Sequence, residues 1–321
     1  MAVPDTYRAD IPAEVNNFYN RTLLERLRPY LQFLRFGQVR DIPRKVGTNV
    51  IKFRRYNTLA AATTPLTEGT TPTGISLTVT DITATVAQYG DYTRLSDIVM
   101  MQSIDPVLTE AAEIFGEQAA DTLEELARDV LSAGTTIRYA NGVASRGVVA
   151  NTISLTDVQI SVRTLQVNKA KKITRIVNPD TGYATSPINA AFVGLVGPNA
   201  LLNLKNLTGW VPIEKYANKA DVMEGEAGAL DEVRFVLTQN AKKWAGEGAN
   251  GADVYATIIL GKDAYGYSRI SGEAIRNIVK PLGSAGAADP LEQRATTGWK
   301  ATFVAKILNE LAMIRIESTA S

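Results

Sequence analysis

The stretch DPVLTEAAEIFGEQAADTLEELARDVLSAG, residues 105–134, predicts a single long amphipathic helix. Asp105 suits the N-cap, Pro106 the first helical position and Gly134 the end. Apolar residues recur at steps of three and four and form one face: Leu108, Ala112, Phe115, Ala119, Leu123, Leu126 and Val130. The other face is acidic: Glu110, Glu113, Glu117, Asp121 and Glu124. A helix of about 28 residues spans about 42 Å, so we expect a strut whose acidic face lies in water or meets a basic partner.

The composition excludes several classes of protein. The 321 residues suffice for about two domains. The 34 Lys and Arg nearly balance the 33 Asp and Glu, so the chain as a whole presents no field for a nucleic acid or an anionic membrane. It has no cysteine and no histidine, which removes disulfides, thiolate nucleophiles, imidazole bases and the usual zinc and iron ligands. Residues 1–12 lack a signal-peptide pattern and no apolar run is long enough to span a membrane, so we expect neither export nor membrane insertion.

The N-terminal segment is basic and carries Arg21, Arg26 and Arg28. It includes a short helical pattern over residues 16–36, with apolar side chains such as Leu27 and Leu31 that need a surface to cover them. We interpret the segment as an arm that packs on something else; the simpler alternative is an ordinary N-terminal helix. Its charge complements the acidic helix, unless both are merely solvated faces.

Two β-rich stretches predict a long hairpin. They are NVIKFRRY, residues 49–56, and GISLTVTDITATVAQYG, residues 74–90. The alternation in the second stretch changes phase, which predicts a bulge or face switch near Asp81. The connecting residues 58–73 include Leu59, Leu66 and Glu68 but little that could form a core. Because isolated two-stranded ribbons are marginal in water, we expect the hairpin to lie on a neighbour.

The remaining chain predicts an α/β module. A helix capped by Thr156 is expected over residues 156–172, packed beside the long helix. A buried strand at 190–198 leads into a helix capped by Asn199. Further strands are expected at 232–241 and 253–270, a loop at 281–298, and a closing pair of strands at 299–318 with a turn near Asn309 and Glu310.

Possible chemical motifs are weak. The glycines of GEGANG, residues 246–251, match a dinucleotide-binding pattern, but such a pattern must follow a strand, and here it precedes one. Nothing in the sequence brings together the acidic pairs Asp180 and Glu214, or Asp253 and Asp263. We therefore expect no catalytic residue, no metal site and no cofactor.

The order of basic arm, hairpin, acidic helix, α/β module and closing strands resembles the major capsid protein of tailed double-stranded DNA bacteriophages and prophages. That α+β fold is shared with encapsulins and the herpesvirus capsid floor. The matching stretches are NTLAAATTPLTEG, SDIVMMQSIDPVLTEAAEIFGEQAADTLEELARDVL, FVGLVGPNALLNL, VRFVLTQNA, IILGKDAYGY and FVAKILNELAMIRIES. They are spread over nearly the whole chain, although no single one is specific alone.

The resemblance implies a division of the chain. Residues 1–47 would form the N-terminal arm and residues 48–95 the extended loop. Residues 96–187, with the spine helix at 105–133, would form the peripheral domain together with residues 286–321. Residues 188–285 would form the axial domain, which in this fold points to the five-fold and six-fold axes.

The function implied is structural: self-assembly through pentamers and hexamers into an icosahedral shell around double-stranded DNA, held without sequence specificity. Expected partners are a separate scaffolding protein, a portal protein and a decoration protein, with no membrane. The protein would reside in the virion, after assembly in the host bacterial cytoplasm. An encapsulin-like compartment is the alternative, and a soluble α/β enzyme a remote one. The candidate assembly residues are Arg21, Arg26, Leu27, Arg28, Leu31, Leu59, Leu66, Glu68, Glu113, Glu117 and Asp121.

Some relatives weld their subunits by an isopeptide bond between a lysine of the extended loop and an asparagine of a neighbour. Here no lysine lies between Lys52 and Lys169, and arginine cannot replace the amine because it stays protonated. Disulfide links are excluded because cysteine is absent. Denaturing electrophoresis of mature particles should therefore show one band near 34.7 kDa. A ladder of oligomers that survives boiling would contradict this.

Overall fold

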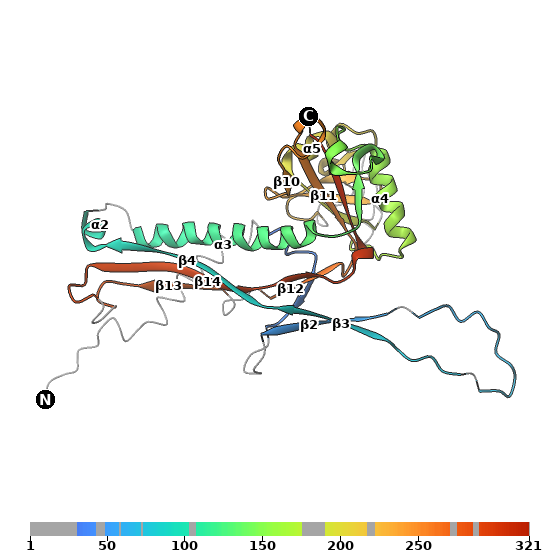
Figure 1. The fold of residues 1–321 in the computed structure, drawn as a ribbon, viewed down its shortest axis with the longest axis horizontal. Coiled ribbons are helices and arrows are strands. Elements are labelled where there is room, and N and C mark those ends of the chain that lie inside the picture. Colours follow the sequence, from blue (N-terminus) through green and yellow to red (C-terminus); the bar gives the residue numbers. More distant parts are fainter. Residues whose placement is uncertain are drawn as a thin grey trace.

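The computed structural model describes residues 31–42, 49–57, 59–71, 73–102, 107–174, 190–216, 222–269, 275–284 and 289–320. The molecule is elongated (Figure 1). A helix and a sheet form a long two-layered body, an α/β lobe rises at one end of it, and a two-stranded hairpin projects beyond that end.

The long body consists of α3 (Val107–Ser132) lying on a three-stranded antiparallel sheet. The strands are β4 (Ala87–Ser96), β13 (Ile275–Lys280) and β14 (Arg294–Phe303), in the order β13-β14-β4, and α2 (Asp97–Gln102) follows β4 directly. The 26 residues of α3 extend about 39 Å. Trp299 and Phe303 of β14 share a buried cluster with Leu123 of α3. The predicted long helix is thus confirmed over its described part; Asp105 and Pro106 lie outside the described residues.

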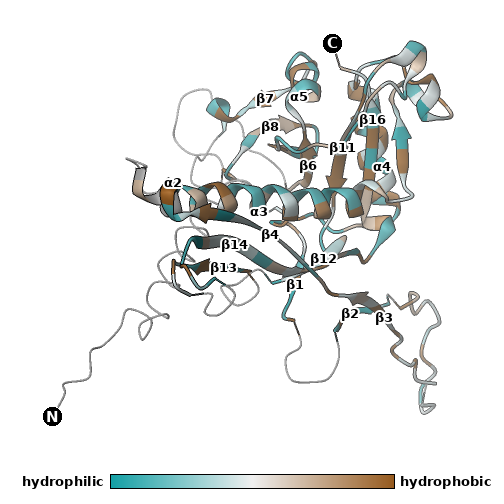
Figure 2. Ribbon diagram, turned by 60° about the vertical axis from the view of Figure 1, so that its left-hand side comes forward, coloured by the Kyte–Doolittle hydropathy of each residue, from teal (hydrophilic) through white to brown (hydrophobic). Residues whose placement is uncertain are grey.

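The two faces of α3 follow the predicted period. Ala112, Phe115, Ala119 and Leu123 are buried, and hydrophobic and hydrophilic bands alternate along the helix in Figure 2. Trp299 Nε1 donates a hydrogen bond to Gln118 Oε1 at 2.9 Å, which ties the sheet to the helix.

The lobe is built on a mixed eight-stranded sheet. Its order is β5-β16-β11-β6-β9-β8-β7, with β10 paired to β11. The strands are β5 (Ile137–Tyr139), β6 (Phe192–Val196), β7 (Val211–Pro212), β8 (Glu226–Leu230), β9 (Val233–Leu237), β10 (Lys243–Trp244), β11 (Val254–Leu260) and β16 (Met313–Ser318). The pairs β6–β9 and β5–β16 are parallel. Strands from 96–187, 188–285 and 286–321 therefore share one sheet.

Both faces of this sheet are covered. Along β11, Ile258 and Leu260 belong to the core under α3, whereas Ile259 belongs to the core under the lobe helices α4 (Leu155–Val167) and α5 (Pro198–Lys205). Successive strand residues point to opposite faces, so one apolar strand serves two cores. This explains the continuous apolar run of β11.

Two smaller sheets complete the fold. One is β1 (Gln38–Arg40), β12 (Tyr265–Ser268) and β15 (Ala305–Ile307); the other is the hairpin of β2 (Val50–Tyr56) and β3 (Val79–Thr85). Short 3₁₀ turns are η3 (Ala140–Gly142), η4 (Arg146–Val148), η5 (Ile213–Lys215), η7 (Ala249–Gly251) and η9 (Glu310–Ala312).

The predicted second hairpin strand is two strands. β3 pairs with β2 in an unbroken register that places Asp81 opposite Arg54, so the predicted bulge at Asp81 is wrong. The break lies at Val86, after which β4 leaves the hairpin and pairs with β14. The phase change in the sequence therefore marks a change of partner sheet rather than a bulge within one ladder.

Two helix caps differ from prediction. Ser154, not Thr156, caps α4, through a reciprocal capping box with Asp157, and the helix ends at Val167. Gly197, not Asn199, precedes α5, because Pro198 occupies its first turn. The prediction that α4 lies beside the long helix is also wrong: its buried residues belong to the other core, beneath β16.

Three strand boundaries are corrected as well. Residues 253–270 form β11 and β12, which join different sheets on either side of a turn where Asp263 has φ 58°. The expected loop at 281–298 includes the start of β14 at Arg294. The closing strands β15 and β16 flank a turn at Asn309 and Glu310, as predicted, but they belong to different sheets instead of pairing.

Candidate assembly surfaces

The hairpin loop is the first candidate surface. Every residue in 59–71 and 73–79 is exposed, although the loop contains several large apolar side chains. Leu66 and Leu77 are 78% and 69% exposed. Leu59 and Glu68 are exposed too, with Glu68 beside Gly69 in a turn. The hydrogen bonds of this described part stay within the hairpin: the Thr70 N–H donates to the Thr67 carbonyl, and Asn57 Nδ2 donates to Thr78 Oγ1.

The base of the hairpin, in contrast, is firmly attached to the body. Ile51, Phe53 and Ala84 form a buried cluster with Leu308, and Arg55 donates a hydrogen bond to the Leu308 carbonyl at 3.2 Å. The loop therefore projects from an anchored base, and its side chains pack against nothing within the described part of the subunit.

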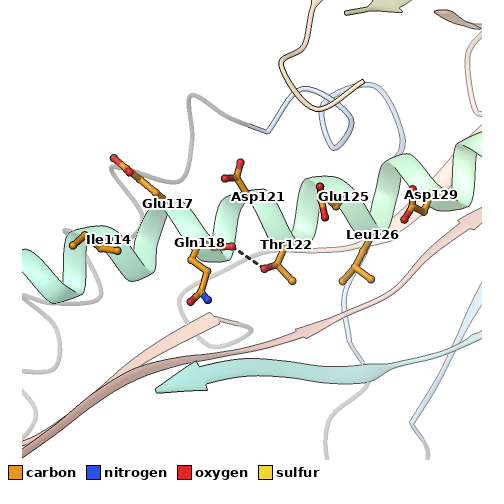
Figure 3. Close-up of a pocket in the computed structure, with 8 residues that line it drawn as sticks. All are labelled: Ile114, Glu117, Gln118, Asp121, Thr122, Glu125, Leu126 and Asp129. Carbon is orange, nitrogen blue, oxygen red and sulfur yellow. Dashed lines mark hydrogen bonds between the residues drawn. The ribbon is translucent and has the colours of Figure 1, made fainter. Parts of the chain in front are cut away.

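The acidic side of α3 is the second candidate surface. It borders an open groove of about 540 Å³, lined by Ile114, Glu117, Gln118, Asp121, Thr122, Glu125, Leu126 and Asp129. Figure 3 shows Glu117 and Asp121 pointing away from the strands, while Gln118 and Leu126 point towards them. Glu113 and Glu117 are half-buried, and Asp121 is exposed.

Part of this acidic side has partners in the lobe. Asp121 accepts a hydrogen bond from Asn240 Nδ2 at 3.0 Å, and Asp129 pairs with Lys242 at 2.9 Å. The loop after β9 therefore joins the C-terminal half of the acidic side to the lobe, which the sequence did not indicate.

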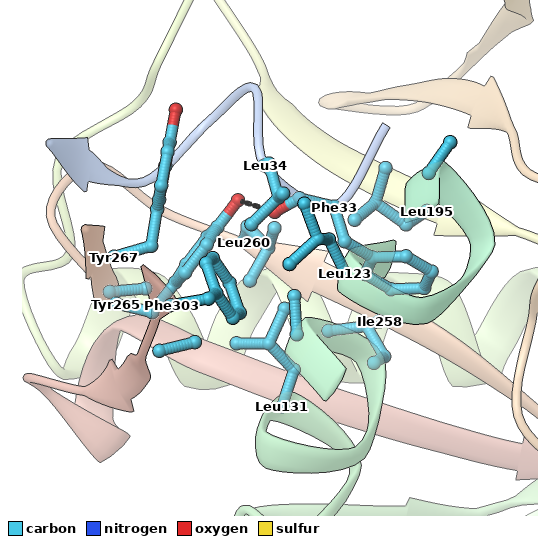
Figure 4. Close-up of a cluster of buried hydrophobic side chains, with 14 of the residues drawn as sticks. Phe33, Leu34, Leu123, Leu131, Leu195, Ile258, Leu260, Tyr265, Tyr267 and Phe303 are labelled. Atoms are coloured by element: carbon cyan, nitrogen blue, oxygen red, sulfur yellow. Dashed lines mark hydrogen bonds between the residues drawn. The ribbon is translucent and has the colours of Figure 1, made fainter. Parts of the chain in front are cut away.

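The described end of the basic arm contacts α3 at Glu124. The Glu124 carboxylate accepts hydrogen bonds from the backbone N–H groups of Gln32, at 2.9 Å, and Phe33, at 2.8 Å. Tyr265 donates a hydrogen bond to the Phe33 carbonyl, and Figure 4 shows Phe33 and Leu34 between α3 and this tyrosine.

One prediction changes at this contact. Glu124 is fully buried, so its placement on the exposed acidic face is wrong. Glu124 lies four residues after Ala120 and three before Ala127, so it shares a helix face with these buried alanines. This spacing is the signal in the sequence that indicates its burial. Leu31 is half-buried against the same core. Arg21, Arg26, Leu27 and Arg28 lie outside the described residues.

Other buried carboxylates are saturated by partners. Glu226 accepts hydrogen bonds from Arg234, Tyr216 and the Met223 N–H. Glu317 pairs with Arg146 and Arg315, both at 2.7 Å. Such groups hold the lobe together and have no free acceptor for acid–base chemistry.

The weak motifs do not form a site. Asp253 precedes β11 and Asp263 lies beyond its other end, and the seven residues of that strand span about 23 Å. The GEGANG residues form a loop with η7 between β10 and β11, as expected. Glu214 lies in η5, and Asp180 is outside the described residues. Among the described residues there is no cluster of potential metal ligands, and no helix is long and apolar enough to span a membrane.

Comparison with known proteins identifies the family. Residues 78–316 match a family whose description is phage capsid protein. The chain belongs to the phage capsid protein family. No curated protein matches the sequence.

Solved capsid structures share the fold of this capsid protein. The capsid of Ralstonia phage GP4 aligns with a TM-score of 0.64 and 13% identity, covering 85% of this chain and 84% of that one. The head structure of Helicobacter pylori bacteriophage KHP40 aligns with a TM-score of 0.61 and 10% identity, covering 91% of this chain and 88% of that one. The capsid of the native GTA particle aligns with a TM-score of 0.54 and 10% identity, covering 100% of this chain and 95% of that one. The α+β capsid fold expected from the sequence is confirmed, and the capsid protein is a structural major capsid protein, not an enzyme.

The anchor of the arm predicts how stability of the capsid protein depends on pH. Burial raises the pKa of Glu124 to about 8, against the opposing pull of the Phe33 and Gln32 N–H groups. A folded pKa above the ordinary 4.5 means that the contribution of Glu124 is fully present below about 4.5 and is lost as pH rises to about 8. Glu124→Gln keeps an acceptor for the two amides but cannot ionise.

We therefore expect the melting temperature of the unassembled wild-type subunit to fall between pH 5 and pH 8 more steeply than that of Glu124→Gln. The measurement is thermal unfolding by circular dichroism across this range. The exposed Glu125→Gln serves as the matched control. Equal slopes for wild type and Glu124→Gln would contradict the assignment.

Proposed function

We propose that this capsid protein is the repeating subunit of a closed icosahedral shell around double-stranded DNA, and that its hairpin loop lies on a neighbouring subunit. The observation that carries the proposal is the loop itself, whose described apolar residues are all exposed, on a firmly attached base. Buried apolar surface is worth about 25 cal/mol per Å², so covering the loop favours association. Identical subunits close a shell by repeating heterologous contacts under symmetry, and each contact can be weak because a subunit makes many at once.

The two parts of the subunit would divide the work. We assign the lobe around the eight-stranded sheet to the axial role, where pentamers and hexamers meet at their axes. The body of α3 and the three-stranded sheet would take the peripheral role, between neighbouring capsomers. The arm would extend to a neighbour beyond its anchor at Glu124, with Arg21, Arg26, Leu27 and Arg28 as contact residues.

Other partners follow from a DNA-filled shell. A separate scaffolding protein would direct assembly in the host bacterial cytoplasm, a portal protein would admit the genome, and a decoration protein would add contacts to the mature virion. DNA would meet arginines of the arm through phosphate alone, without sequence specificity.

Electron microscopy of the purified protein, expressed with and without a scaffolding protein from the same genome, tests the proposal. We expect closed icosahedral particles. A stable monomer or dimer by light scattering under every assembly condition would overturn it. Particles that carry a protein cargo and no DNA during infection would favour the encapsulin-like alternative.

The acidic side of α3 supports a further prediction about assembly. We expect the triple variant Glu113→Lys, Glu117→Lys and Asp121→Lys to lower particle yield more than it lowers the melting temperature, because basic arms of neighbours would be repelled. Exposed ion pairs are worth only about 0–1 kcal/mol each, but the shell repeats them. Particle yield by sedimentation at low salt is the measurement.

The control is the triple variant with Gln at the same three positions, which removes charge without reversing it. Yield should fall in the order wild type, Gln variant, Lys variant, and added salt should narrow the differences. Equal yields at low salt would remove the idea that this face meets a basic partner.

A further inference from the structure

The three-stranded sheet has a second face, turned away from α3. Trp299 and Ala301 of β14 are buried on the α3 side, so the alternate residues Gly298 and Lys300 face the other way. The strand register then defines three rows across this second face. The rows are Arg94–Thr296–Lys280, Tyr92–Gly298–Ile278 and Gly90–Lys300–Arg276. We call it the basic sheet face, and it also includes Arg294.

The charge of this face has one sign. Its cationic side chains are all exposed: Arg94, Arg276, Lys280, Arg294 and Lys300. No Asp or Glu occupies an outward position of β4, β13 or β14, since Asp91 lies on the α3 side and accepts a hydrogen bond from Gln118. Within the described chain none of these cations forms an ion pair. Among the described residues, Arg94 is the only one of the five whose side chain has a polar contact, with the Tyr92 hydroxyl at 3.2 Å, while the backbone N–H of Arg294 donates to the Asp289 carboxylate at 2.8 Å.

The centre of the face is hollow and apolar. A groove of about 540 Å³ crosses it, bordered by Tyr92, Ile278 and the glycines of β4 and β14. A Cβ at Gly298 would lie 2.6 Å from the Asp91 carbonyl oxygen, and one at Gly90 would lie 2.4 Å from that of Trp299. Larger residues cannot fill the hollow, because the strands approach too closely there. Tyr92 is 60% and Ile278 44% exposed beside it.

We propose that the basic sheet face binds an acidic segment of a second protein, with one large apolar side chain seated in the hollow between Tyr92 and Ile278. The inference rests on the proposed function and deepens it, because it names the surface and the chemistry for a partner of the shell. The cations would form a polar rim around a buried apolar anchor, the usual anatomy of a protein interface.

Two other occupants fit less well. A DNA backbone would use the cations but gains nothing from an apolar hollow lined by Ile278. The hairpin loop of another copy has Leu66 as an anchor but Glu68 as its one carboxylate between residues 57 and 80. One carboxylate complements little of a face that carries five cations.

The probe is a short fluorescein-labelled polyglutamate peptide with one central tryptophan, titrated by anisotropy against the full-length unassembled subunit. We expect Arg276→Glu with Lys300→Glu to weaken binding about tenfold or more. The matched control, Lys205→Glu with Lys215→Glu, makes the same charge change on exposed lysines of the lobe and should bind as wild type does. Replacing the tryptophan of the peptide by glycine, or Ile278 by serine, should weaken binding as well.

Several results would overturn the proposal. One is an equal loss of peptide binding in the lobe control variant. Another is peptide binding that does not change when the tryptophan is replaced. A third is a DNA duplex that binds as tightly as the peptide and depends in the same way on Arg276 and Lys300. A gain in peptide binding on Leu66→Ser would mean that the loop of another copy competes with the peptide for the hollow, and this result would also count against the proposal. Particle formation by the same variants is scored separately, so closed shells without peptide binding would remove this inference and leave the proposed function standing.

Discussion

Replacing residues 58–77 of the hairpin loop by a two-residue Asn-Gly turn is expected to abolish closed particles while the subunit still folds. Tyr56 pairs with Val79, and the Asn57 N–H bonds to the Thr78 carbonyl, so a short turn can close the ladder there. The melting temperature should change by less than about 3 °C, because the described residues among those removed are exposed and the buried base at Phe53 remains.

The measurement pairs thermal unfolding of the subunit with electron microscopy and sedimentation of assembly reactions. A graded control keeps the loop length and replaces Leu66 and Leu77 by serine, which should lower yield by removing apolar contact alone. Thr63→Ser, an exposed polar change in the same loop, should assemble as wild type does. Normal particles from the shortened variant would mean that the loop does not hold neighbours together.

Arg234→Met is expected to destabilise the subunit by about 3–5 kcal/mol, because it leaves a buried carboxylate without its cation. Arg234 and Glu226 are 3% and 6% exposed, and their side chains meet at 2.6 Å. After the change, Glu226 would retain only the Tyr216 hydroxyl and the Met223 N–H as donors. Urea unfolding of the unassembled subunit gives the free energy.

A second variant separates the charge from the packing. Arg234→Met combined with Glu226→Leu removes both charges and should recover much of the lost stability, since buried pairs are often replaceable by apolar residues. Arg54→Met is the matched control at the exposed pair with Asp81, where no measurable loss is expected. An Arg234→Met subunit as stable as wild type would show that the pair does not hold β8 to β9.

Local patterns in the sequence predicted the elements that depend on local physics. The spacing of Ala112, Phe115, Ala119 and Leu123 predicted α3, since a helix repeats its buried face every 3.6 residues. The alternation of β-branched residues predicted the hairpin. The connecting residues contain little that could form a core, which predicted that the loop with Leu59 and Leu66 is exposed. The absence of cysteine and histidine from the sequence excludes thiolate, imidazole and disulfide chemistry.

Long-range pairing settled the rest. Glu124 is acidic and looked exposed, yet the arm residues Gln32 and Phe33, more than ninety positions away, supply its donors. The strand breaks at Val86 because β4 pairs with β14, which lies about two hundred residues later in the sequence. The basic sheet face combines residues 87–96, 275–280 and 294–303. Each strand alone shows only one or two ordinary surface cations, and the register between distant strands makes them a single surface.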